Sequence, residues 1–399
     1  YNNQFSLDGL AFITPEAAEK LDGVSVEEED VLLNITGDSV ARCCSAPSYV
    51  LPARVNQHVA IIRPRPEEFI PRFIRYFLVS PDQQARMLKM AGSGATRNAL
   101  TKGMIEDFSI PKPEIDTQRS ITKILGDLDD KIDLLREMNR SLEDIARAVF
   151  RAWFVDFEPV RAKAAGAKNF RGMPQDLFDT LPDSFEQSDG GAIPKGGNAP
   201  LLPALGEPPR RAANPNNIDG STPYIGLEHM PRRSITLSEW ETAEKVSSNK
   251  HSFERFELLF GKLRPNFHKV GIAFVDGVCS TDIVVVRPRT PEYFGIALGV
   301  LSSDDFVAHN VAATSGTKMP RTSWEIMARY EVALPDLTSP LIIEFDRLSR
   351  SIAERLEANV HEGRTLAALR DTLLPKLIAG ELTAPSLEAL GLKAVSDGG

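Results

Sequence analysis

The sequence has little cysteine and no long apolar run. Three cysteines occur among 399 residues: Cys43 and Cys44 are adjacent, and Cys279 is distant. Neighbouring cysteines rarely pair with each other and no Cys-x-x-Cys spacing is present, so we expect reduced, partly buried thiols in a cytoplasmic protein. No stretch of 18 apolar residues occurs, so we expect no membrane-spanning helix. The polar opening YNNQFSLDG does not resemble a signal peptide.

The sequence also lacks the common catalytic motifs. The six histidines show no metal-ligand spacing, and neither a phosphate-binding G-x-x-x-x-G-K-[ST] loop nor a G-x-G-x-x-G fingerprint is present. The stretch NPNN at 214–217 differs from the Asn-Pro-Pro-aromatic pocket of amino-methyltransferases. We therefore expect a chain without a catalytic site, a metal site or a cofactor of its own.

The charge is acidic overall but unevenly distributed. The net charge is −9, which taken alone argues against a nucleic-acid binder. Residues 31–113 carry 11 Lys/Arg and 6 Asp/Glu, whereas residues 114–158 carry 7 and 11. Because local patches matter more than the total, the basic segment keeps polyanion binding open.

Residues 118–153 predict a long helix, since they contain no proline and only one glycine, Gly126. A 3.5-residue repeat of apolar positions, interrupted by Asn139, predicts a coiled-coil seam in which the asparagine can fix register. We expect the charged side chains outside the seam, Asp129 and Glu143 among them, to face water. The seam comprises Ile121, Leu125, Leu128, Ile132, Leu135, Asn139, Leu142, Ala146, Val149 and Trp153.

A second stripe in residues 341–377 predicts the partner helix, with Gly363 as a weak point and Pro375 ending it about one turn later. We expect the two helices to pair antiparallel. The stripe comprises Phe345, Leu348, Ile352, Leu356, Leu366, Leu369, Leu373 and Leu377.

The sequence contains a duplication with an offset of 224 residues. Arg63-Pro64 corresponds to Arg287-Pro288, and Pro111 corresponds to Pro335. Each copy predicts a mixed module followed by a long helix. We expect strands at 30–35, 58–64, 108–111, 257–263, 271–275, 282–288 and 330–335, and short helices at 71–90 and 294–311. Residues 163–223 are rich in Pro, Gly and Ala and predict an extended or loosely packed linker.

These patterns indicate an α+β fold with two tandem α/β modules separated by two long antiparallel coiled-coil helices, in a pseudo-twofold arrangement. Such a protein is suited to reading two half-sites across an unread gap. Because the modules differ in sequence, the half-sites should differ too.

Several stretches of the sequence resemble a known family. The stretches FRAWFVDFEPVRAKAAG (150–166) and RTLAALRDTLLPKLIAGEL (364–382) are similar to the connecting region and the C-terminal helix of specificity subunits of Type I restriction–modification enzymes. The target recognition domains of that family have strand-loop elements similar to ELLFGKLRPNFHKV and DVLLNITGDSV. Gly197 departs from the family's usual Gly-Trp, which puts the packing at the start of copy two in question.

The resemblance implies a non-catalytic subunit that binds double-stranded DNA. It also implies two methyltransferase subunits as partners, which bind S-adenosylmethionine and methylate adenine, and motor-nuclease subunits for cleavage. The expected organisation is a first target recognition domain in 1–115 with an incomplete start, a long helix in 116–158, a connecting segment in 159–223, a second target recognition domain in 224–337, and a second long helix in 338–382.

Two loops in each copy have the composition of DNA-contacting segments, because Lys and Arg bind phosphates and polar side chains read base edges. In copy one the candidates are Asn34, Thr36, Arg42, Arg97, Asn98, Thr101 and Lys102. In copy two they are Lys262, Arg264, Asn266, His268, Lys269, Thr317, Lys318, Arg321 and Thr322.

Other interpretations remain open. Each loop residue also fits a solvated surface, and Trp153 and Phe154 fit either a partner interface or ordinary burial. The chain as a whole also fits a coiled-coil scaffold for protein assembly without sequence-specific DNA binding. A stand-alone nuclease would need a cluster of acids with a lysine in one module, and the sequence shows none.

Overall fold

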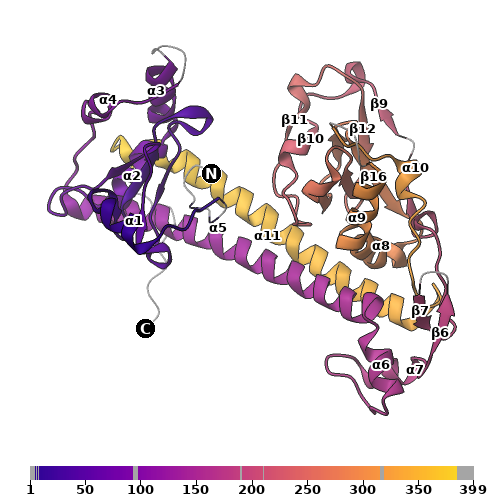
Figure 1. Ribbon diagram of the computed structural model, residues 1–399. Helices are drawn as coiled ribbons and strands as arrows, with labels where there is room; N and C mark the ends of the chain where they lie inside the picture. Colours follow the sequence, from indigo (N-terminus) through magenta and orange to yellow (C-terminus); the bar gives the residue numbers. More distant parts are fainter. Residues whose placement is uncertain are drawn as a thin grey trace. The chain divides into compact units, whose positions relative to one another are not determined.

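The structure, a computed structural model, describes residues 5, 7, 9–92, 98–188, 191–209, 211–314 and 319–383. The chain forms two compact units, one of residues 1–133 and 365–399 and the other of residues 134–364. Each unit combines β-sheets with helices, and segments of the same two long helices belong to both (Figure 1). The predicted α+β class with two sheet-bearing units in tandem and two long helices is confirmed. Within the described residues, no helix is both apolar and long enough to cross a bilayer.

Unit 1 contains short strands and helices that precede the first long helix. Its strands are β1 (Ser25–Val26), β2 (Val31–Asn34), β3 (Cys43–Ser45), β4 (Ala53–Arg54) and β5 (Val59–Ile62). Its helices are α1 (Pro15–Lys20), α2 (Pro71–Val79), α3 (Pro81–Gly92), α4 (Lys102–Glu106) and the start of α5 (Ile115–Phe150).

Unit 2 contains the remaining elements. Its strands are β6 (Phe185–Ser188), β7 (Gly191–Pro194), β8 (Gly206–Glu207), β9 (Ala212–Ala213), β10 (Pro223–Ile225), β11 (Glu241–Thr242), β12 (Lys250–Phe253), β13 (Leu258–Gly261), β14 (Val270–Ile272), β15 (Gly277–Cys279) and β16 (Ile283–Pro288). Its helices are α6 (Glu158–Ala164), α7 (Gln175–Thr180), α8 (Phe294–Leu301), α9 (Asp304–Ala313), α10 (Trp324–Met327) and most of α11 (Pro340–Ile378).

The central sheets of the two units share one hydrogen-bond register. The order β3-β2-β5 in unit 1 matches β14-β13-β16 in unit 2, and all these neighbours are antiparallel. Val31 pairs with Ile62, and Leu258 pairs with Val286. Leu258 follows Val31 by 227 residues, whereas Val286 follows Ile62 by 224, because the β3–β5 connection is three residues longer than its counterpart. The predicted duplication is therefore confirmed.

The backbone and a buried ion cluster repeat as well. Left-handed φ angles recur at the 227-residue offset in the pairs Glu29 and Phe256, Gly37 and Arg264, and Ala41 and His268. In unit 1, Arg63 binds the buried Asp30 (2.6 and 2.7 Å) and Glu27 (2.6 Å). In unit 2, Arg287 binds Glu257 and Glu254 in the same way, at 2.6 Å each. The arginines that mark the repeat in the sequence are therefore structural anchors.

Two of the expected strands do not form. Residues 108–111 are not a strand, and residues 330–335 make only two isolated bridges, from Glu331 to Leu201 and from Leu334 to Asn198. Both segments lead into a long helix. Pro111 and Pro335 lack the N–H that a ladder needs, so extended pairing stops at these positions.

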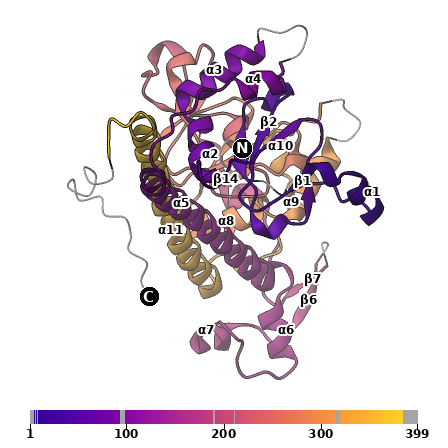
Figure 2. The ribbon, with the colours of Figure 1, turned by 90° about the vertical axis from the view of Figure 1, so that its left-hand side faces the viewer.

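The segment predicted as a loose linker is folded instead. Residues 163–223 include α7, the β6–β7 hairpin and several short strands (Figure 2). Leu177, Phe178 and Leu181 are buried in the same core as Trp153 and Phe154. The composition suggested a linker because prolines and glycines are frequent, but widely spaced apolar residues are sufficient to anchor the segment. Ordinary burial is the confirmed interpretation for Trp153 and Phe154.

The two long helices pack against each other as predicted, and their direction is antiparallel. In unit 1, Asp129 of α5 meets Arg370 of α11, and in unit 2, Phe150 of α5 meets Phe345 of α11. A residue later in α5 therefore contacts a residue earlier in α11. The helix α11 continues through Gly363 and ends at Ile378, shortly after Pro375, as expected.

Asp129 and Glu143 correct the expectation that charged positions outside the seam face water. Asp129 is 9% exposed and Glu143 is 5% exposed. Glu143 accepts hydrogen bonds from the hydroxyl of Ser234 (2.7 Å) and from the amide of Thr236 (3.1 Å), and also contacts the Thr236 hydroxyl. These carboxylates attach α5 to the sheet-bearing part of each unit.

Gly197 resolves the question raised by the departure from Gly-Trp. A Cβ placed there would lie 2.9 Å from the carbonyl oxygens of both Pro194 and Leu334. The adjacent Asn198 exchanges two backbone hydrogen bonds with Leu334, each 2.9 Å long. Close backbone approach thus takes the place of a large side chain at the start of copy two.

The seam asparagine has a partner that the sequence did not reveal. Asn359 of α11 donates through Nδ2 to Oδ1 of Asn139 at 2.8 Å, and both side chains are buried. We expect Asn139→Leu to lower the free energy of unfolding by about 1–3 kcal/mol, because it leaves the Asn359 amide buried without its acceptor. Adding Asn359→Leu should recover most of this loss. Urea denaturation of the two single variants and the double variant measures the effect, and additive losses would contradict it.

Candidate nucleic-acid interface

Two loops of unit 1 are joined into one surface by backbone hydrogen bonds. One loop connects β2 to β3, and the other precedes α4. The amide of Leu100 donates to the carbonyl of Ile35 (2.8 Å), and the amide of Gly37 donates to the carbonyl of Asn98 (3.1 Å). The predicted candidates in residues 34–42 and 98–102 are therefore neighbours in space. Arg97 lies outside the described residues.

Unit 2 builds the equivalent surface with the same bonds. The amide of Thr322 donates to the carbonyl of Lys262 (3.0 Å), and the amide of Arg264 donates to the carbonyl of Pro320 (2.8 Å). Isolated bridges, Thr36 to Ala99 and Leu263 to Arg321, mark the same junction in both units. Thr317 and Lys318 lie outside the described residues.

The shared bonds define which loop positions of the two units correspond. Lys269 is the counterpart of Arg42, because these residues accept equivalent bonds from Gly261 and Asn34. Asn34 corresponds to Gly261 rather than to a basic residue, and Thr36 corresponds to Leu263. An alignment shifted by one or two residues in a short loop changes the pairing completely.

Equivalent positions carry different chemistry in the two units. Unit 2 has basic side chains at Lys262, Arg264 and Arg321. The positions equivalent to these in unit 1 are Ile35, Gly37 and Ala99. The backbone scaffold is thus repeated, while the side chains at these three positions differ between the units.

The unit 1 surface contains a shallow recess of about 410 Å³, lined by Thr36, Gly37, Asp38, Ser39, Arg42 and His58. The Thr36 hydroxyl lies 2.7 Å from Nδ1 of His58, which orients the imidazole ring at the rim. Arg42 is exposed. His58 was not among the sequence-based candidates, and only its position just before the β5 strand could have suggested it.

The second loop of unit 1 has its polar groups partly engaged. The hydroxyl of Thr101 accepts a hydrogen bond from the amide of Met104 (3.3 Å) and so caps α4. Lys102 lies 3.6 Å from Glu106 in an exposed pair one turn apart, which costs little to break. Asn98 is exposed. Asn98 and Lys102 are therefore accessible to a ligand, whereas Thr101 also holds the loop.

Two of the unit 2 candidates are internal. Thr322 is 2% exposed, and its hydroxyl donates to Oδ1 of Asn310 in α9. His268 is buried with its Nε2 2.9 Å from the carbonyl oxygen of Ser302, and burial lowers the pKa of this imidazole. Both side chains hold the loops on α9 and its N-terminus, so their burial does not support direct contact with a ligand.

The other unit 2 candidates are more accessible. Arg264 and Asn266 are exposed on the connection between β13 and β14. Arg321 is about half-exposed and contacts the carboxylate of Asp282. Lys269 is half-buried, and its Nζ donates to the carbonyl of Leu227 (2.5 Å).

Two consecutive arginines extend this surface and were missed in the sequence. The guanidinium of Arg232 lies 3.9 Å from the ring centre of Phe267, and that of Arg264 lies 5.6 Å from it. The amide of Arg233 donates to the carbonyl of His268 (2.9 Å). The Arg-Arg pair after Pro231 was the available signal, but it has no counterpart in copy one to draw attention to it.

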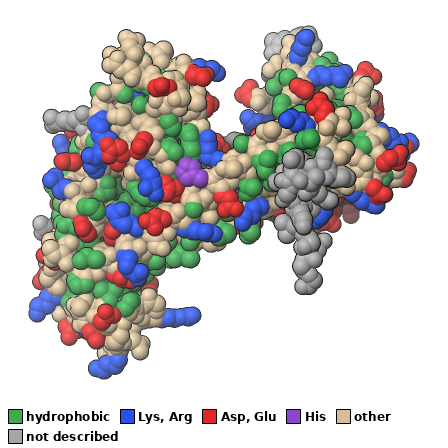
Figure 3. Space-filling view, turned by 180° about the vertical axis from the view of Figure 1, so that it is seen from behind, with side chains coloured by type: hydrophobic (Ala, Val, Ile, Leu, Met, Phe, Trp, Pro, Cys, Tyr) green, Lys and Arg blue, Asp and Glu red, His purple; other side chains and the backbone are tan. Residues whose placement is uncertain are grey.

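Outside these loops, acidic and basic side chains are intermixed on the face shown in Figure 3. No group of His, Cys, Asp or Glu within the described parts of the chain is arranged to hold a metal ion. None of the three cysteines, all within the described residues, forms a disulfide, and burial raises the pKa of the Cys279 thiol to about 12. The loops at the ends of the central sheets are therefore the best candidates for a polyanion interface.

The chain is similar to proteins of one kind. Residues 1–144 match the family described as Type I restriction modification DNA specificity domain. The specificity subunit of the Type I restriction enzyme HindI from Haemophilus influenzae is 24% identical over 378 residues, covering 82% of this chain and 81% of that subunit. The specificity subunit of MjaIX from Methanocaldococcus jannaschii is 23% identical, with coverage of 78% and 69%.

A solved S subunit of a Type-I restriction-modification system from M. genitalium covers 89% of this chain and 84% of its own, with a TM-score of 0.49 at 14% identity. The predicted relationship is confirmed by sequence: residues 1–144 carry a Type I restriction modification DNA specificity domain, and the chain is related over most of its length to specificity subunits of Type I restriction enzymes.

Proposed function

We propose that this chain is a non-catalytic subunit that reads a bipartite, asymmetric DNA target and directs partner enzymes to it. The observation that carries the proposal is the repeated scaffold with unlike loops. Units 1 and 2 share the register of their central sheets, yet Ile35 stands where Lys262 stands and Ala99 where Arg321 stands. Two readers with different side chains select two different half-sites.

The partners follow from the relatives. The relatives are named specificity subunits, which indicates a role in recognition. We therefore assign the chemical reaction to other chains of the complex. We assign two methyltransferase subunits, which hold S-adenosylmethionine and methylate adenine, and motor-nuclease subunits that join for cleavage in the cytoplasm. Segments of the helices α5 and α11 belong to both units, so a single chain carries both readers.

Methylation mapping tests this proposal directly. A genome that carries the complete system should show methylated adenines within one split motif, made of two unlike short half-sites and a gap of fixed length. Deleting the gene for this chain should remove methylation at that motif, while a deletion of the motor-nuclease gene should leave it. A continuous motif, or two identical half-sites, would contradict the proposal. A protein scaffold without DNA specificity would leave no motif that depends on this chain.

A further inference from the structure

Unit 2 contains a cavity of about 630 Å³ beside its two candidate loops, the β13–β14 connection and the loop that precedes α10. Its apolar walls include Pro208, Val284 and Trp324, and its polar lining includes His251, Lys262 and Arg321. A mostly apolar recess with a few polar groups is the usual form of a specific binding site. The cavity adjoins the junction of the two loops, since Lys262 and Thr322 are bonded through their backbones.

The cations around this cavity are unequally engaged. Arg211 binds Glu254 (2.7 Å) and Glu257 (2.8 Å), and Arg321 contacts Asp282. In contrast, no hydrogen bond or ion pair joins the Lys262 ammonium to any residue that the structure describes. Burial is the main cause of a lowered pKa at Lys262, followed by repulsion from Arg321. Lys262 is thus the cation whose hydrogen-bonding capacity remains to be satisfied.

The backbone under Lys262 is rigid. Its amide donates to the carbonyl of Asp282 (2.7 Å), its carbonyl accepts from Thr322, and the preceding Gly261 closes β13 against β14 with a bond to Lys269 (2.8 Å). These bonds fix the point from which the side chain of Lys262 extends, and Lys262 is part of the cavity lining. Arg264, by comparison, is exposed on the connection itself. A recessed donor is suited to a base edge that enters the site, and an exposed cation is suited to phosphates.

We propose that Lys262 is a specificity-determining residue of unit 2, donating through Nζ to the acceptor edge of one guanine in the half-site that this unit reads. This inference rests on the proposed DNA-reading function. Guanine presents two acceptors, O6 and N7, in the major groove, and lysine offers only donors. Lys262 is half-buried in the lining of the cavity, so a base that presents a donor there leaves the ammonium without an acceptor.

Unit 1 has no lysine at the equivalent position. Ile35 occupies the position of Lys262, as the equivalent bonds from Leu100 and Thr322 show. The lysine-dependent guanine should therefore occur in only one of the two half-sites.

Selection from random duplexes tests the inference on the full chain assembled with its methyltransferase partners. The wild-type complex should enrich guanine at one position of one half-site. Lys262→Met, which keeps an unbranched side chain one atom shorter and removes its donors, should lose the preference at that position alone. Its dissociation constant for the best wild-type duplex should rise about 10- to 100-fold. Lys262→Arg should keep guanine, because arginine also reads the O6/N7 edge.

Arg264→Gln serves as the matched control. As an exposed cation on the same hairpin, it should weaken all duplexes alike, leave the selected motif unchanged, and reduce the slope of log K against log salt by about 0.9. Lys262→Met should leave that slope as it is in the wild type.

Two outcomes overturn the assignment while the DNA-reading function stands. One is an unchanged motif for Lys262→Met with a wild-type melting temperature. The other is uniform weakening with a reduced salt slope, which would place Lys262 on a phosphate. A wild-type complex that selects no motif would overturn the proposed function and, with it, this inference. If Lys262→Met melts early, Lys262→Leu replaces it, because leucine also lacks donors, and a retained guanine preference in that variant would equally overturn the assignment.

Discussion

Replacing Asp129 by alanine should lower the free energy of unfolding by about 3–5 kcal/mol. The carboxylate is 9% exposed, and it joins α5 to two other helices of unit 1. It accepts hydrogen bonds from the hydroxyl of Tyr76 (2.8 Å) and from the guanidinium groups of Arg75 (3.2 Å) and Arg370 (2.8 Å). Alanine removes the carboxylate that the guanidinium groups of Arg75 and Arg370 share and leaves these groups in a poorly solvated place, although Arg370 also binds Asp371 (2.7 Å).

Urea denaturation followed by circular dichroism measures this loss, and Asp130→Ala is the matched control. Asp130 is the next residue of α5 and is exposed, so its removal should change the free energy of unfolding by less than about 0.5 kcal/mol. Asp129→Asn should fall between the two, because the amide oxygen still accepts one hydrogen bond but carries no charge. Equal values for Asp129→Ala and Asp130→Ala would show that the cluster contributes no stability.

Asp129 also illustrates which features the sequence could predict. The seam of α5 was predictable because ten positions repeat every three to four residues, and a single helix cannot bury such a stripe alone. The roles of Asp129 and Glu143 were not predictable from that periodicity, because charged residues beside a seam usually face solvent. Their partners, Arg75 and Thr236, lie 54 and 93 residues away in sequence, and only the folded chain brings them together.

The duplication was predictable for a different reason. The Arg-Pro pairs at Arg63 and Arg287 end equivalent strands, and the arginines bind equivalent carboxylates, so the same sequence signal recurs. The detailed pairing of loop residues was less accessible. A three-residue difference in one connection changes the offset from 227 before it to 224 after it, so Thr36 aligns with Leu263 and not with Phe260, as the offset of 224 would suggest.

The sequence could indicate which loops lie together, but not which of their side chains are exposed. Gly, Thr and basic residues in both copies identified the loops, and the backbone bonds at Ile35 and Lys262 bring them together as one surface in each unit. Composition does not report side-chain direction, however. Thr322 and His268 have the polar character of contact residues, yet they point inward because Asn310 of α9 and Ser302, the residue after α8, are their partners.

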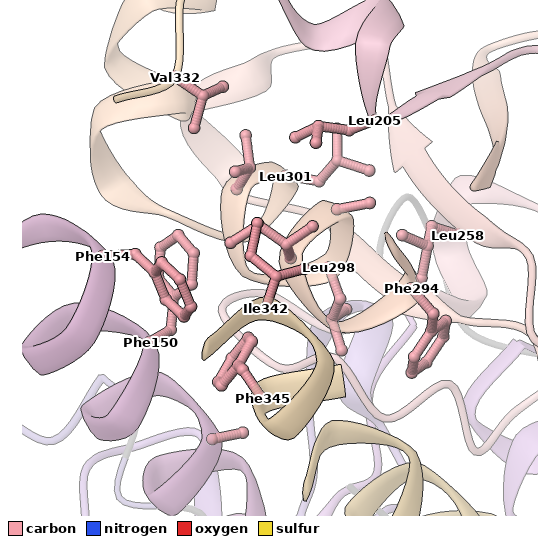
Figure 4. Close-up of a cluster of buried hydrophobic side chains, with 14 of the residues drawn as sticks. Phe150, Phe154, Leu205, Leu258, Phe294, Leu298, Leu301, Val332, Ile342 and Phe345 are labelled. Atoms are coloured by element: carbon pink, nitrogen blue, oxygen red, sulfur yellow. The ribbon is translucent and has the colours of Figure 1, made fainter. Parts of the chain in front are cut away.

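Phe345→Ala should also cost about 3–5 kcal/mol, measured for the unfolding of unit 2. Phe345 of α11 is 2% exposed and lies near Phe150 and Phe154 at the end of α5 (Figure 4). Its ring centre is 5.9 Å from that of Phe150, 6.2 Å from Trp153 and 5.1 Å from Phe154. Truncation removes the transfer free energy of the ring and leaves a cavity that these large neighbours fill only in part.

Tryptophan fluorescence reports this unfolding selectively, because Trp153, Trp240 and Trp324 all belong to unit 2. Phe345→Leu is the matched control, since leucine keeps most of the volume and should cost less than about 1.5 kcal/mol. The exposed Ile343 lies on the same helix, and Ile343→Ala should have a small effect. The difference between Phe345→Ala and Phe345→Leu isolates the cavity, because both variants lose the aromatic ring. Equal costs for these two variants would mean that the loss comes from ring–ring contacts rather than from unfilled volume.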